Sequence, residues 1–129
     1  RSYAALGDVL LRAGEAEQAV VLLREAATEW QEDDRLRFLL ALAHARQAQH
    51  QETLANVEAY LARHPDDAEA MLVAAHALFA AQAERQVIVS DQTDRDRLAH
   101  YVALYVRSGG PHADLVAGWA PPETVPAPR

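Results

Sequence analysis

The stretch "YLARHPDDAEA", residues 60–70, holds the end of one helix and the start of another. Proline disfavours a helical conformation in the residue before it, so His64-Pro65 ends the first helix. Asp66 and Asp67 offer carboxylate oxygens to the free amide groups of the next helix's first turn. The stretch therefore predicts a seam between two structural units inside an alanine-rich helical region.

The composition indicates a globular helical domain. Of the 129 residues, 50% are hydrophobic, mostly alanine and leucine, and 24% are charged. This length supports one domain with a real core, and alanine and leucine favour helix over strand. The net charge of −7 argues against sequence-independent binding of nucleic acid, which needs a basic surface.

Cysteine and lysine are both absent from the chain. Without cysteine, disulfides, thiolate catalysis and cysteine-based zinc sites are excluded. All twelve basic residues are Arg, which we interpret as the base composition of a bacterial genome. A cysteine-free bacterial protein suits the cytoplasm and the periplasm equally. No run approaches the roughly 18 apolar residues that span a bilayer, so we expect no membrane insertion.

Helical periodicity is plain in five segments. They cover 2–13, 15–29, a third helix opened by Asp33 and Asp34, a fourth that ends before Pro65, and about 67–83. The apolar stripes of these segments recur at a fixed interval, because Leu6-Gly7 corresponds to Leu40-Ala41 and then to Ala74-Ala75. A period of 34 with two helices per period predicts a helical-hairpin repeat.

In these features the chain resembles the tetratricopeptide repeat family. The first copy, 1–33, matches through Tyr3, Leu6-Gly7, Ala19 and Ala26; the second, 34–67, keeps Leu40-Ala41, Val57 and Pro65. The third, 68–107, keeps Met71, Ala74-Ala75 and Leu78 and then departs. The resemblance implies an all-α, right-handed helical-hairpin solenoid of about seven helices with a C-terminal capping helix.

Beyond residue 83 the pattern is less regular. Thr93 with Asp96 predicts the N-terminal cap of a sixth helix over about 94–107. A last piece, 111–119, is expected to lay Leu115, Val116 and Trp119 over the open end of the stack. The repeat domain then spans 1–119, and the proline-rich residues 120–129 are expected to form a tail or linker.

No catalytic or metal-binding constellation is visible. The six histidines show no metal-ligand spacing supported by a carboxylate, and Asp96 with His100 is the only ligand-like pair, more simply a surface hydrogen bond. The serines lack a nucleophile-elbow context, and "SGGP" lacks the lysine of a phosphate loop. We therefore expect no enzyme, no metal and no cofactor.

A surface remains as the candidate site. In the tetratricopeptide family the first helix of each pair lines the concave face, and its positions outside the core face a bound peptide. The resemblance carries this role onto Arg12, Arg35, Phe38, Leu42, Arg46, Leu72, His76 and Phe79. Aromatic and aliphatic anchors bordered by arginine suit a peptide of apolar and acidic character.

Simpler roles for the same residues stay open. The arginines fit a solvated helix face equally well, and Phe38 and Phe79 fit packing against neighbouring helices. For Trp30, Trp119, Tyr101 and Tyr105 we expect places in the core.

The sequence thus predicts a protein–protein interaction scaffold within a larger bacterial protein. Two alternatives remain: a self-association module that uses Leu115 and Trp119, and an accessory domain of an enzyme whose active site lies outside these residues. A homo-oligomer is compatible with each of them, and the identity of the partner is not encoded in any motif.

Overall fold

The computed structural model describes residues 2–30, 33–88 and 91–121, and these residues form α-helices without any strand. This confirms the predicted all-α class. The helices are α1 (Ser2–Arg12), α2 (Ala16–Glu29), α3 (Asp34–Arg46), α4 (His50–Arg63), α5 (Ala68–Ala83), α6 (Asp91–Ser108) and α7 (Ala113–Ala117). Tyr3 lies in α1, but its side chain is outside the described residues, as are Gln31 and the tail from residue 122.

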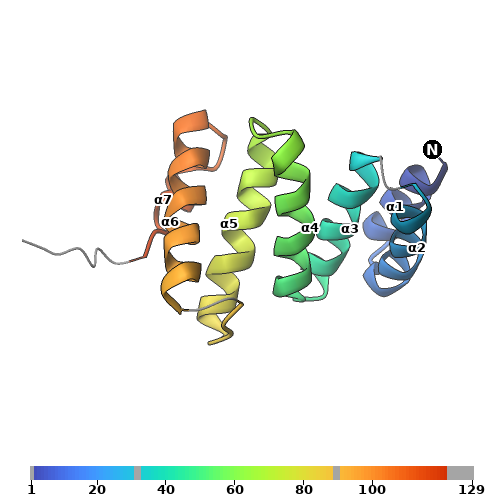
Figure 1. The fold of residues 1–129 in the computed structure, drawn as a ribbon, viewed down its shortest axis with the longest axis horizontal. Coiled ribbons are helices and arrows are strands. Elements are labelled where there is room, and N and C mark those ends of the chain that lie inside the picture. The colour runs from blue at the N-terminus through green and yellow to red at the C-terminus, as the bar shows by residue number, and fades with distance from the viewer. Residues whose placement is uncertain (1, 31–32, 89–90, 122–129) are drawn as a thin grey trace, which may run out of the picture.

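The helices lie side by side in the order of the sequence, from α1 and α2 at one end to α6 and α7 at the other (Figure 1). Each helix packs on the next, and within the described residues α1 and α2 have no extensive contact with α5, α6 or α7. The buried apolar side chains form two clusters. The N-terminal core consists of Leu11, Ala19, Val20, Leu23, Ala26, Leu36, Leu39, Leu40 and Ala43. The C-terminal core consists of Ala41, Leu54, Val57, Ala70, Met71, Ala74, Ala75, Leu78, Leu98, Val102, Tyr105 and Val116.

The first two helix pairs repeat at the predicted interval. Helix α4 begins at position 50 and ends at position 63, which is one period after the start of α2 at 16 and its end at 29. The turns inside the pairs agree, because Gly14 and Ala48 are also one period apart and both adopt a left-handed φ, of 81° and 57°. The backbone bond from Glu15 N–H to Leu10 O recurs from Gln49 N–H to His44 O. The period found in the sequence therefore corresponds to a repeated backbone conformation.

The helix end and the capped helix start that the sequence predicts at residues 60–70 are confirmed. Helix α4 ends at Arg63, before Pro65, and the Asp67 side chain accepts from Ala70 N–H at the start of α5. Asp33 caps α3 in the same way. The Tyr60 hydroxyl donates to Asp67 at 2.7 Å, and burial together with that carboxylate raises the pKa of Tyr60 to about 12.

An ionic contact joins the ends of the second helix pair. At the start of α3, Asp34 accepts from His64 at 2.9 Å and from Arg63 at 3.0 Å, beside the C-terminus of α4. The His64 hydrogen bond, reinforced by Arg63, lowers the pKa of the Asp34 carboxyl. A carboxyl group whose pKa is lowered by folding stabilises the folded chain at pH values above its ordinary, unfolded-state pKa. This stabilisation is lost as the pH falls through the pKa of the folded state.

The third helix pair departs from the period. Helix α5 has 16 residues against 13 in α3, and the left-handed turn residue is Arg85 instead of Gln82, which is one period after Ala48. Helix α6 begins at Asp91, so the predicted start at 94 with a Thr93 cap is wrong. Thr93 and Asp94 lie inside the first turn of α6, and the buried Asp94 carboxylate accepts from Ile88 N–H at 2.7 Å.

The C-terminal segment turns back onto the last helix pair. Val116 of α7 is fully buried, and α7 packs on α6. Trp119 is half-buried, whereas Leu115 is 63% exposed. Leu115 is one of the three residues expected to cover the end of the stack, and this expectation is wrong because its side chain faces solvent.

Candidate functional site

Four of the candidate residues form one stripe on α3. Arg35, Phe38, Leu42 and Arg46 recur at the spacing that places side chains on a single helix face. The opposite face of α3, with Leu36 and Ala43 among others, is buried in the N-terminal core. The stripe lies on a less buried side of α3, where Arg35 and Arg46 are exposed and Phe38 and Leu42 are partly buried.

The stripe continues from α3 onto the neighbouring first helices. Helix α3 contacts both α1 and α5, and Leu72 and His76 of α5 are the equivalents, one period on, of Phe38 and Leu42. Among the described residues the backbones of α2, α4 and α6 do not approach one another as closely. Long side chains link α4 with α6, because Arg97 and Tyr101 both donate to Glu58.

The three candidate arginines have different surroundings. Arg46 donates to the Leu11 carbonyl at 2.8 Å, satisfying a carbonyl in the last turn of α1. Arg12 pairs with Asp8 one turn away at 3.1 Å. Arg35 is exposed, and no hydrogen bond or ion pair joins its guanidinium to another described residue. Arg35 is thus the candidate arginine whose charge is most available to a ligand.

The apolar candidates are partly used by the fold. The Phe38 ring lies 4.9 Å from the Tyr60 ring of α4, centroid to centroid. Leu42 packs against the N-terminal core and Leu72 against the C-terminal core, and both side chains stay half-exposed. These three residues therefore pack internally with one side and leave the other side open.

Trp119 already occupies the α5 end of the stripe. Its indole stacks on Phe79 with a centroid distance of 5.3 Å and an interplanar angle of 13°. The same indole meets the His76 ring at 5.5 Å. Burial, with a smaller effect of His50, lowers the pKa of His76. No local pattern in the sequence indicates this contact, because Trp119 is distant from Phe79 along the chain and its place depends on the turn before α7.

The other large aromatic residues divide between core and surface. Tyr105 is fully buried, as expected. Tyr101 is half-buried and donates to Glu58 at 2.6 Å, and burial with this hydrogen bond raises its pKa. Trp30 is 54% exposed, so its predicted place in the core is wrong. It follows the last residue of α2, where the helix stripe no longer directs it inward.

The residues considered for chemistry stay apart. Asp96 accepts from Gln92 at 3.0 Å, while the His100 ring meets Tyr101 edge-on at 5.2 Å, so Asp96 and His100 are not joined. Across residues 2–30, 33–88 and 91–121, no three histidine, aspartate or glutamate side chains gather as metal ligands. The metal-like spacing in the sequence therefore does not correspond to a ligand set.

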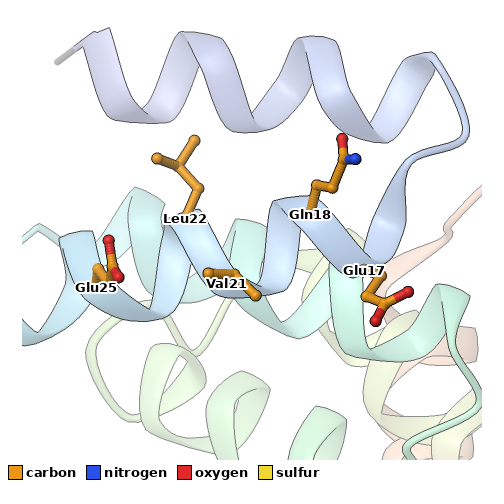
Figure 2. A pocket seen from close by; sticks show the side chains of 5 residues that line it. All are labelled: Glu17, Gln18, Val21, Leu22 and Glu25. Carbon is orange, nitrogen blue, oxygen red and sulfur yellow. The ribbon is translucent and has the colours of Figure 1, made fainter.

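A separate open cavity lies on α2. It has a volume of about 490 Å³ and is lined by Glu17, Gln18, Val21, Leu22 and Glu25. Figure 2 shows Gln18 and Leu22 extending from α2 toward α1. These residues lie on the side of α2 opposite the buried Ala19 and Leu23. The cavity is therefore a different surface from the stripe on α1, α3 and α5.

No protein-family model, curated protein or solved structure matches this chain. In the part of the chain that the structure describes, none of the helices has the length and apolar character needed to cross a membrane.

Proposed function

We propose that the three helix pairs form a right-handed helical-hairpin solenoid, similar to tetratricopeptide repeats, that acts as a non-enzymatic protein–protein interaction module. The observation that carries this proposal is the contact pattern of the first helices. Helix α3 contacts α1 and α5, whereas the second helices, among the described residues, stand further apart. Such a row is curved, and its inner face is formed by the first helices.

The proposed ligand is an extended peptide with apolar and acidic side chains. Half-exposed Leu42 and Leu72 offer apolar surface on the inner face, and the exposed guanidinium of Arg35 offers a bidentate grip for a carboxylate. Trp119 stacks on Phe79 and contacts the exposed His76 ring, so the part of the inner face without Trp119 runs from α1 to the first half of α5. A surface formed in advance by packed helices loses little conformational entropy on binding.

A charge reversal at Arg35 tests this proposal. Peptides selected on the immobilised chain from a random displayed library should be acidic and apolar. They should bind the Arg35→Glu variant at least about tenfold more weakly, because a charge-assisted contact becomes a repulsion. The dissociation constants are measured by fluorescence anisotropy, and circular dichroism checks that the variant keeps its helicity.

Arg24→Glu is the matched control, because Arg24 is an exposed arginine of α2, on the other side of the row. It should leave peptide affinity unchanged. Equal weakening by both substitutions would reduce the effect to net charge, and no weakening by Arg35→Glu would remove the inner face as the site.

A further inference from the structure

The outer side of α1 exposes two large apolar side chains. Leu6 is 46% exposed and Val9 is 58% exposed, whereas Gly7 and Leu11 on the other side of the helix are buried. A helix that closes a row of repeats normally turns a polar face to solvent. The Leu6–Val9 stripe is therefore unlike the outer face of a terminal helix.

The equivalent stripes of the later helix pairs are covered. One period on, Leu40 and Ala43 of α3 are buried in the N-terminal core with Val20 and Leu23 of α2. Two periods on, Ala74 and Ala77 of α5 are buried, and Ala74 shares the C-terminal core with Leu54 and Val57 of α4. In both cases the second helix of the preceding pair contacts the helix that carries this stripe.

We propose that the Leu6–Val9 stripe of α1 is the docking surface for the second helix of a further helix pair. The occupant is an amphipathic helix with a stripe of small and aliphatic residues, like Ala19-Val20-Leu23 of α2 or Thr53-Leu54-Val57 of α4. The proposed contact would repeat the α2–α3 and α4–α5 contacts, which the chain already contains. It depends on the repeating register of the helices and not on peptide binding by the inner face.

Within the described residues, a second copy of this chain offers no second helix whose apolar stripe is uncovered. The apolar stripe of α2 is covered by α3, and that of α4 by α5. Helix α6 packs on α5 and is also covered by α7, through the fully buried Val116. The two ends of the row therefore differ: α7 packs on α6 at one end, where Leu115 and Val106 are exposed, and at the other end α1 presents Leu6 and Val9 with no helix packed over them among the described residues.

The test adds a helix pair in register. Residues 34–68 are duplicated directly before Arg1, so that the copy of α4 stands before α1 as α4 stands before α5. Hydrogen exchange of the α1 amides, measured by mass spectrometry, should slow at least about tenfold in the extended chain. Substituting Leu6→Glu with Val9→Glu should abolish that slowing, and the same pair should leave the thermal midpoint of the original chain nearly unchanged.

Val21→Glu is the control, since Val21 is also an exposed apolar residue but lies on the outer side of α2. It should keep the slowed exchange. Unchanged α1 exchange in the extended chain would overturn the proposal. So would light scattering that shows the original chain as a dimer which Leu6→Glu with Val9→Glu dissociates, because the face would then belong to a second copy.

Discussion

Replacing Tyr105 by alanine should lower the free energy of unfolding by about 3–5 kcal/mol. Among the residues whose burial is described, Tyr105 is the largest fully buried side chain, and it lies in the C-terminal core, which also contains Met71 of α5 and Val116 of α7. Its ring also lies against Gly110, where there is no room for a Cβ atom. Deleting the ring leaves a cavity at the junction of three helices, and a loss of this size is a large part of a domain's stability.

Tyr105→Phe is the matched control for this prediction. It keeps the ring and removes the hydroxyl oxygen that accepts from His112 N–H at 3.1 Å. Losing one hydrogen bond of this kind should cost about 1 kcal/mol. Urea denaturation followed by circular dichroism measures both variants. Equal losses for Ala and Phe would mean that the hydroxyl, and not the packed ring, holds the segment.

The second large effect is expected from the contact of Gly7 with Leu23. A Cβ atom on Gly7 would lie 2.6 Å from Leu23 Cδ2 and 2.9 Å from Leu23 Cγ. One period on, the same two positions hold Ala41 and Val57, and all four residues are buried. At the first of these positions Gly7 is smaller than Ala41, and at the second Leu23 is larger than Val57. The loss of volume at one position is thus offset by a gain at the other.

A double-mutant cycle exploits this exchange of size. Gly7→Ala should destabilise the chain by about 1–2 kcal/mol, because overpacking outweighs the better helix propensity of alanine. Leu23→Val should cost about 1 kcal/mol by leaving a small cavity. The double variant reproduces Ala41 with Val57 and should recover most of the loss, with a coupling of about 1–3 kcal/mol in chemical denaturation. Additive losses would contradict the equivalence of the two helix pairs.

Local signals account for what the sequence predicted correctly. The stripes of α2 and α4, the caps at Asp33 and Asp67 and the stop before Pro65 depend on neighbours within one turn. They follow from side-chain periodicity and capping alone. The bounds of α1, α2 and α5, the start of α3 and the end of α4 were therefore predictable to within a residue or two.

The errors arise where specific side-chain contacts decide the structure. In the first turn of α6, Asp94 takes a buried position that the repeat pattern gives to an apolar residue, and its carboxylate accepts from Ile88 N–H. At the candidate site, Arg46 is fixed by the carbonyl of Leu11 in another helix. Trp119 reaches Phe79 across the turn at residues 109–112. The contacts of Arg46 and Trp119 are tertiary, so no periodicity in the sequence reveals them.

The absence of cysteine allows a direct test of the open row of helices. A single Val9→Cys variant, labelled with a nitroxide on the outer side of α1, reports by paramagnetic broadening of amide signals which helices lie near that end. An open row of helices should give broadening in α1 and in neighbouring parts of α2 and α3, and sharp signals throughout α6 and α7. Strong broadening of the Val106 or Leu115 amide signal would show that the two ends of the chain pack together. Such a result would contradict the open row of helices.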